Sequence, residues 1–359
     1  MIKKTLTSLL LGGSLAITSC NSGMENLVED PTEVVTPTPS PTDTPTPILN
    51  LPSPENKQKG MNVVSWWHTD YDSPEAITSL ENLRASNNEW MSLLVTWYQD
   101  GITSTDIYRK EFKTHSDESL VKMITEAQRL GMNVMLKPHV DLEGGNWRGN
   151  IGGFLKEEDY AKWFASYRSF INHYAELAEQ NNVGQLCLGT EFVGLTNREN
   201  DWREVIRGVR EKFKGKLVYS ENHDNIENNK WFGELDYIGI SGYFPLTKKL
   251  DPTVEELKEA WNPHIEKIER VQRKFGKEVI FTEIGYRSVD GTNIHPWAKV
   301  DCIEQADCYK AFFESVWKNS WMHGAYFWGW ETRTQTGQDE GFTPQEKKAQ
   351  EVIKEYYGQ

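Results

Sequence analysis

From Gly60 to the C-terminus, short apolar runs alternate with longer amphipathic stretches. A short apolar run bounded by polar residues or glycine is typical of a buried strand. Apolar residues that recur every three to four positions indicate a helix with one buried face. We therefore predict strands at residues 61–66, 91–97, 133–138, 185–191, 217–221, 237–241, 279–283 and 325–328. Helices are predicted between them, at residues 74–85, 117–130, 157–180, 201–213, 225–232, 254–275, 302–318 and 344–357.

Eight strand-then-helix units in about 300 residues match the (β/α)8 barrel in order, number and length. The alternative is an open, doubly wound parallel sheet, which usually carries a glycine-rich phosphate loop after its first strand. Here the first predicted strand ends in Trp66-Trp67-His68, which cannot cradle a pyrophosphate. The sequence therefore favours a TIM barrel, formed by residues 60–359 as a single domain.

The first 59 residues differ in character from the rest. Two lysines, an apolar run and small residues make residues 1–20 resemble a secretory signal, and Ile17-Thr18-Ser19-Cys20 resembles the bacterial lipobox. The alternative is an ordinary signal peptide with a chance cysteine. Residues 21–59 include PTPSPTDTPTP and predict an extended, disordered linker. We therefore expect an exported protein anchored by lipid on Cys20 at the outer or cytoplasmic membrane surface of the cell envelope.

Composition narrows the chemistry. A net charge of -14 gives no electrostatic footprint for nucleic acid. The 14 tryptophans either stack on sugar faces or fill a large core, and composition alone does not separate these readings. His and Cys residues show no metal-ligand spacing, so neither a metal nor a cofactor is expected. Cys302 and Cys308 are a possible disulfide in an oxidising compartment, and Cys187 is expected to be a buried thiol.

Two glutamates stand at predicted strand ends, where a (β/α)8 barrel carries its chemistry. Glu191 ends the fourth strand and Glu283 the seventh. Retaining glycoside hydrolysis needs two carboxyl groups about 5–5.5 Å apart, one as the acid and one as the nucleophile. Cys187 and Gly189 share the parity of Glu191, which would place small residues beneath the carboxylate. Glu221, at the end of the fifth strand, is the nearest rival for a direct role in the chemistry.

Several longer strings resemble glycoside hydrolase family 113, whose known members are β-mannanases. They are LKPHVDLEGGNWRG, CLGTEF, FTEIGYRS, HPW, QADCYKAFF and YFWGW, and the resemblance extends from Gly60 to Tyr357. It implies that Glu191 is the acid/base, that Glu283 is the nucleophile, and that Tyr243 hydrogen-bonds the nucleophile. Most members of the wider clan carry an asparagine before the acid/base, which binds the sugar 2-hydroxyl. Thr190 stands there instead, so Asn222 or His139 is a candidate for that contact.

Further candidates for substrate binding are aromatic, amide or charged residues at or just beyond the predicted strand ends. Trp328 and Trp330 share parity on either side of Gly329, so both could face the mouth of the barrel. The structural alternatives are core packing for the tryptophans, a satisfied buried histidine, and capping of strand ends. The predicted contacts are Trp67, His139, Trp147, Arg148, Asn222, Tyr243, Trp328 and Trp330.

The resemblance implies a retaining enzyme that cleaves β-1,4-mannosidic bonds in mannan or glucomannan by double displacement, without a cofactor. A β-glucanase or xylanase of the same clan would share the fold and both glutamates. A lipoprotein that binds glycans without cutting them would share the aromatic rim. We expect a monomer whose partners are a β-mannan or manno-oligosaccharide and, through the lipid anchor, a membrane.

Overall fold

The computed structural model describes residues 57–291, 299–333 and 339–359. The predicted signal peptide, Cys20 and nearly all of the predicted linker, together with the HPW string, lie outside these residues. Within the described ranges, no helix is both long enough and apolar enough to cross a membrane.

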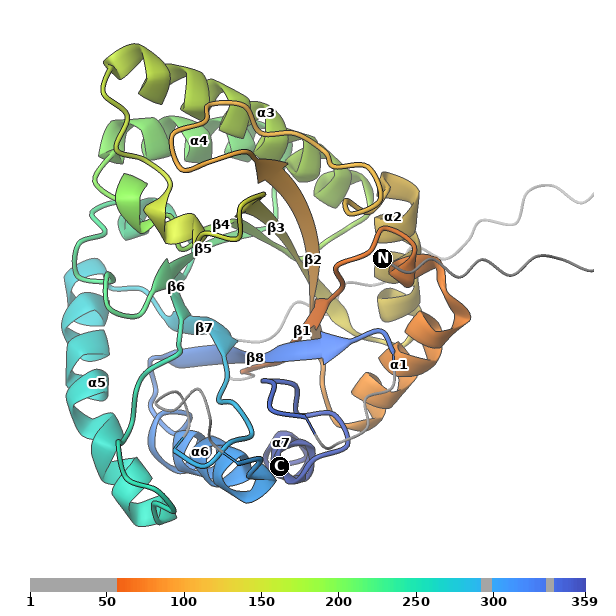
Figure 1. Ribbon diagram of the computed structural model, residues 1–359, viewed down its shortest axis with the longest axis vertical. Coiled ribbons are helices and arrows are strands. Elements are labelled where there is room, and N and C mark those ends of the chain that lie inside the picture. The colour runs from red at the N-terminus through yellow and green to blue at the C-terminus, as the bar shows by residue number, and fades with distance from the viewer. Residues whose placement is uncertain (1–56, 292–298, 334–338) are drawn as a thin grey trace, which may run out of the picture. The chain divides into compact units, whose positions relative to one another are not determined.

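The described chain forms a closed, parallel barrel in which each strand pairs with the next and β8 pairs with β1 (Figure 1). This confirms the predicted (β/α)8 fold, and every predicted strand overlaps an observed one. The strands are β1 Gln58–Val64, β2 Trp90–Gln99, β3 Asn133–Leu142, β4 Gln185–Thr190, β5 Lys216–Asn222, β6 Ile238–Ser241, β7 Val279–Ile284 and β8 Met322–Glu331.

The α-helices surround the barrel (Figure 1). Several begin where the sequence provides a cap: the Ser73 hydroxyl accepts a hydrogen bond from the Ala76 N–H, and Ser116 accepts one from Ser119. The helices are α1 Pro74–Ala85, α2 Asp117–Arg129, α3 Glu157–Gln180, α4 Glu199–Lys212, α5 Val254–Phe275, α6 Cys302–Ser315 and α7 Lys348–Tyr357.

The prediction of a short helix at residues 225–232 is wrong. Turns occupy residues 223–228, followed by a 3-10 turn at Phe232–Glu234. The segment is rich in asparagine, and its amide side chains bond locally: Asn228 donates to Asn225, and Asn229 accepts from the Trp231 N–H. Such local bonds compete with helical hydrogen bonding, which explains the difference.

The barrel interior is layered. Its lower part is an apolar cluster of Trp90, Met135, Cys187, Val218, Ile280 and Tyr326. A polar layer above it is closed by internal hydrogen bonds, such as those that the Ser220 hydroxyl makes with the hydroxyls of Ser241 and Thr282. The much larger apolar cluster lies between the barrel and the helices. Below the carboxyl ends of the strands, the barrel interior is therefore filled by a layer of buried, hydrogen-bonded polar side chains.

Extra residues in β4 and β7 redirect the side chains at their carboxyl ends. Between Cys187 and Thr190 the register of β4 shifts by one residue against β5, and β7 shifts similarly just before Glu283. The parity prediction for Gly189 is therefore wrong: a Cβ there would lie 2.5 Å from the Tyr167 hydroxyl on α3, so this position faces the helices. Bulges of this kind commonly re-aim side chains beside active sites.

A similar shift in β8 explains the position of Trp330. Met61 of β1 pairs with Phe327 and Val63 pairs with Trp330, so β8 carries one more residue than β1 over this stretch. Trp330 is consequently buried in the outer core, and its indole N–H donates to Ser79 on α1. The prediction that Trp330 is a substrate contact is therefore wrong, because its ring lies in the core.

The predicted Cys302–Cys308 disulfide is also wrong. Both residues belong to α6, where six residues of α-helix separate their Cα atoms by about 9 Å along the axis. A disulfide requires Cα atoms closer than about 7 Å. Cys187 is buried inside the barrel, as predicted.

Replacing Gly189 tests the packing of β4 against α3. Gly189→Ala places a methyl group against the Tyr167 hydroxyl, and we expect it to lower the free energy of unfolding by about 1–3 kcal/mol. Gly208→Ala on α4 is the matched control, since its Cβ would make only ordinary contacts with Asn172 of α3 and alanine favours a helix by about 0.5–1 kcal/mol. Urea denaturation of both variants measures the difference; equal stability would contradict the packing argument.

Candidate active site

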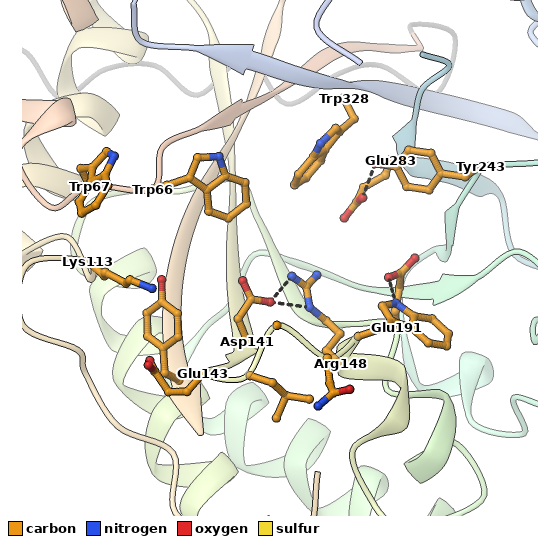
Figure 2. A pocket seen from close by; sticks show the side chains of 15 residues that line it. Trp66, Trp67, Lys113, Asp141, Glu143, Arg148, Glu191, Tyr243, Glu283 and Trp328 are labelled. Carbon is orange, nitrogen blue, oxygen red and sulfur yellow. Dashed lines mark hydrogen bonds and ion pairs between the residues drawn. The ribbon is translucent and has the colours of Figure 1, made fainter. Parts of the chain in front are cut away.

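A cavity of about 610 Å³ opens at the carboxyl ends of the strands. Glu191 and Glu283 lie toward one side of it, with Trp66, Trp67 and Lys113 at the opposite side (Figure 2). The cavity is lined by Trp66, Trp67, Tyr98, Lys113, Asp141, Leu142, Glu143, Gly145, Asn146, Trp147, Arg148, Glu191, Tyr243, Glu283 and Trp328.

Glu191 follows directly after β4, with its backbone in the left-handed region at a φ of 58°. Its N–H donates to the Ser220 carbonyl at 2.8 Å, and its carboxylate accepts a hydrogen bond from the Trp147 indole at 2.9 Å. The side chain is partly exposed, yet enough protein surrounds the carboxyl group that burial raises its pKa. The negative charge of Glu283 raises this pKa further, so Glu191 keeps its proton to a higher pH than an ordinary glutamate.

Glu283 lies in a different environment. It is 4% exposed and forms an ion pair with Lys137, which reaches it from inside the barrel on β3. The Tyr243 hydroxyl donates to its other carboxylate oxygen at 2.7 Å. Burial beside this carboxylate raises the pKa of Tyr243, so the tyrosine stays a donor. A cation and a hydrogen-bond donor both favour the ionised carboxylate.

The two carboxyl groups are therefore prepared for opposite roles. Glu191 is favoured as an acid, and Glu283 is held as an anion within the same cavity. Pairs of titratable groups whose surroundings favour opposite protonation states mark the acid and base of an active site. The arrangement can donate a proton to one atom of a bound molecule while a carboxylate attacks a neighbouring atom.

The loop after β3 closes one wall of the cavity. Arg148 forms an ion pair with Asp141, its Nε donating to the carboxylate at 3.0 Å (Figure 2). This pair fixes the loop from its two ends and leaves Trp147 directed at Glu191. At the start of the loop, Glu143 pairs with Lys110. Two of the predicted contacts, Trp147 and Arg148, thus line the cavity.

The aromatic residues divide between the cavity and its support. Trp328 lines the cavity beside Glu283, and Trp67 is 57% exposed at the opposite side (Figure 2). The ring of His139 lies parallel to Trp328, with centroids 6.1 Å apart. His139 itself is buried; burial, and secondarily the cations of Arg148 and Lys137, hold its pKa well below the ordinary value. It is therefore a neutral residue behind the cavity wall.

Asn222 and Glu221 also lie away from the cavity lining. Asn222 is mostly buried at the end of β5, where its side-chain oxygen accepts only a long bond from the Asp224 N–H among the described contacts. Glu221 is fully buried and held by Thr196, Asn225 and Asn229, which join the loops after β4 and β5. Burial raises the pKa of Glu221 to about 7, but its position makes it a support for these loops.

Lys137 is the site residue that sequence reasoning missed. It is fully buried, and among the described ion pairs it is the single lysine or arginine bonded to Glu283. The signal was available: a lysine stands inside the apolar string VMLKPHV, and a buried charge needs a partner. Tyr98 and Lys113 line the cavity as well, without having been predicted.

The described residues contain no cluster of three or more His, Cys, Asp or Glu side chains able to hold a metal ion. The cavity has aromatic faces, hydroxyl-binding carboxylates and amide groups, which suit an uncharged polar ligand with flat apolar faces. The Thr190 hydroxyl is buried at the end of β4 and forms no hydrogen bond with any of the described residues.

Comparisons with known proteins agree with this chemistry. The model of Glycoside Hydrolase Family 113 matches residues 64–347. A solved complex of a family 113 β-1,4-mannanase is 28% identical, with a TM-score of 0.77 over 84% of this chain and 99% of that one. The family 113 β-mannanase AaManA from Alicyclobacillus acidocaldarius, in complex with ManMIm, is 26% identical, with a TM-score of 0.77 over 84% and 97%.

A more distant similarity supports the fold alone. The Ruminococcus gnavus β-glucuronidase is 13% identical, with a TM-score of 0.56 over 84% of this chain and 50% of that one. A comparison with curated proteins found no match.

The bond from Trp147 to Glu191 makes a testable contribution to the acid. Trp147→Phe removes the N–H that stabilises the ionised carboxylate, so we expect the pKa of Glu191 to rise further. Carbon-13 NMR titration of labelled glutamate, with Glu191→Gln for assignment, measures it. Trp66→Phe is the control, because Trp66 lines the cavity without bonding either carboxylate. An unchanged or lowered pKa in Trp147→Phe would contradict the contact.

Proposed function

The chain belongs to glycoside hydrolase family 113, and from this membership and the geometry of its two glutamates we propose that it is a retaining β-mannanase. Its substrates would be mannan and glucomannan, cleaved at β-1,4-mannosidic bonds. The observation that carries the proposal is one cavity holding a carboxyl group with a raised pKa and a second, ion-paired carboxylate. The β-mannanase activity of the similar solved structures supports the choice of substrate.

The first chemical step breaks the bond between the anomeric carbon and the glycosidic oxygen. Glu191 gives its proton to that oxygen, which leaves as a hydroxyl group with the bonding electron pair. A Glu283 carboxylate oxygen forms a bond to the anomeric carbon, so a glycosyl ester results and Glu191 becomes a carboxylate. Tyr243 and Lys137 hold Glu283 in place for the attack.

The second step reverses these roles. Glu191 takes a proton from water, and the water oxygen bonds to the anomeric carbon as the ester bond to Glu283 breaks. Glu283 leaves as a carboxylate, and Glu191 is again protonated. Two inversions at the same carbon give net retention of the anomeric configuration.

Two other functions remain as outcomes of the test. A β-glucanase or xylanase would use the same glutamates with different sugar contacts. A glycan-binding protein would need the aromatic walls, but it would not need an acid beside an ion-paired nucleophile. The electrostatic contrast between Glu191 and Glu283 therefore favours hydrolysis over binding alone.

Replacing either glutamate should remove most turnover. We expect Glu283→Ala and Glu191→Ala to lower kcat on mannan by at least about a thousandfold, since each removes a group required in the transition state. Activity is measured on mannan, glucomannan, xylan and carboxymethylcellulose, and proton NMR identifies the first anomer formed from manno-oligosaccharides. Near-normal mannan hydrolysis by Glu283→Ala would overturn the proposal, as would an inverted first product.

The pH profile of the intact enzyme provides a separate test. Activity should fall at low pH as Glu283 is protonated, and at high pH as Glu191 loses its proton, giving a bell-shaped dependence of kcat/KM. The raised pKa of Glu191 should extend activity beyond the pH at which an ordinary glutamate ionises. A flat profile from about pH 4 to 9 would contradict an acid paired with a carboxylate nucleophile.

We also propose that lipid on Cys20 holds the enzyme at the cell envelope after export. The support is the sequence of residues 1–59, with its apolar run, lipobox-like string and Pro/Thr-rich linker. Cys20→Ala should lose incorporation of labelled palmitate and leave the membrane fraction, while activity per molecule stays unchanged. Equal labelling of Cys20→Ala and the unaltered protein would contradict the anchor.

A further inference from the structure

Lys137 occupies an unusual place for a lysine. Its side chain is fully buried inside the barrel, and its Nζ donates to the Thr282 carbonyl at 3.3 Å as well as pairing with Glu283. The same Nζ lies 5.6 Å from the centre of the Trp328 ring. A buried ammonium is costly to desolvate, so its pairing must serve either stability or function.

Among the groups around Glu283, Lys137 is the cation that balances the charge of its carboxylate. Arg148 lies close enough to influence both glutamates, but it is already paired with Asp141. His139 stands 3.9 Å from the Glu283 carboxylate, and its lowered pKa keeps it neutral. The Tyr243 hydroxyl and the buried Cys187 thiol are also neutral, because burial raises the pKa of each. Glu191 is the remaining neighbour whose charge can change during the reaction.

We propose that Lys137 is a fixed positive charge that balances the negative charge of each catalytic glutamate in turn, first that of Glu283 and then that of Glu191. This inference rests on the proposed double displacement. In the free enzyme Lys137 balances ionised Glu283, while Glu191 is protonated. In the glycosyl-enzyme Glu283 is an uncharged ester, and Lys137 balances Glu191, which has become the base.

The exchange keeps the buried site electrically balanced throughout the reaction. Ester formation removes the negative charge that raises the pKa of Glu191, whereas the lowering effect of Lys137 on that pKa persists. The acid of the first step is thereby converted into the base of the second without movement of the protein. Lys137 exchanges no proton or covalent bond on this account; it contacts the Glu283 carboxylate and is a positioning residue that acts through both glutamates.

Lys137→Met tests the charge, because methionine keeps an unbranched chain and removes the ammonium. We expect kcat/KM on mannohexaose to fall about 100-fold, in line with the loss of one buried electrostatic group. The acid limb of its pH profile should move to higher pH by about one unit or more, since a buried carboxylate without its cation ionises less readily. Lys137→Arg keeps the charge, so its acid limb should match that of the unaltered enzyme.

A second substrate isolates the glycosyl-enzyme. An aryl β-mannoside with a 2,4-dinitrophenyl leaving group needs no acid in the first step, so hydrolysis of the ester limits its turnover. In Lys137→Met this turnover should also fall, with its acid limb at higher pH, because Glu191 ionises less readily as the base. Met135→Leu is the structural control: Met135 lies on the same strand within the apolar interior, and its variant should keep both profiles.

Stability measurements keep the inference falsifiable if Lys137→Met folds poorly. Glu283→Gln leaves the ammonium unpaired, so it should unfold at a lower temperature than Glu191→Gln. Lys137→Met/Glu283→Gln removes both charges and should be more stable than Lys137→Met or Glu283→Gln alone. A double variant no more stable than either single one would overturn the inference.

Two results separate this inference from the proposed function. A folded Lys137→Met with the acid limb of the unaltered enzyme, beside an inactive Glu283→Ala, would overturn the role of Lys137 and leave the hydrolase mechanism standing. Activity of Glu283→Ala would instead overturn the mechanism on which the inference rests.

Discussion

The ion pair between Lys137 and Glu283 governs the electrostatics of the whole site. Removing a carboxylate and an ammonium from water costs several kcal/mol for each ion, and their attraction offsets this only when further hydrogen bonds complete the geometry. The barrel supplies those bonds from the Tyr243 hydroxyl and the Thr282 carbonyl. With Glu283 held as an anion, its charge helps to raise the pKa of Glu191. Burial is the larger cause of this raised pKa, and the charge of Glu283 adds to it.

The architecture could be predicted from the sequence because the barrel repeats one simple pattern. Each apolar run lies between the interior and a ring of helices, so hydrophobicity alone locates the strands. Strand ends meet at one mouth in a parallel barrel, which made Glu191 and Glu283 neighbours despite their distance in sequence. Caps such as Ser73 and Ser116 located helix starts for an equally local reason.

The details that failed at the ends of β4 and β8 depend on strand register, which alternation along a single strand does not contain. One extra residue in β4 turned Gly189 toward α3, and one in β8 turned Trp330 toward α1. Whether a strand bulges depends on the strand with which it pairs. Over the paired stretches, β4 carries one more residue than β5, and β8 carries one more than β1. Lys137 was missed for a related reason: its partner comes from a strand 146 residues away, so nothing local marks the lysine as paired.

The tryptophans show why position carries more information than composition. Trp163, Trp202, Trp231 and Trp261 are fully buried between barrel and helices, where they fill volume. The cavity is lined instead by Trp66, Trp67, Trp147 and Trp328, each at a strand end or in the loop that follows. An abundance of tryptophan is thus explained largely by a large core. What indicates a sugar ligand is the placement of a few rings beside one carboxyl group whose pKa is raised and a second that is paired with a lysine.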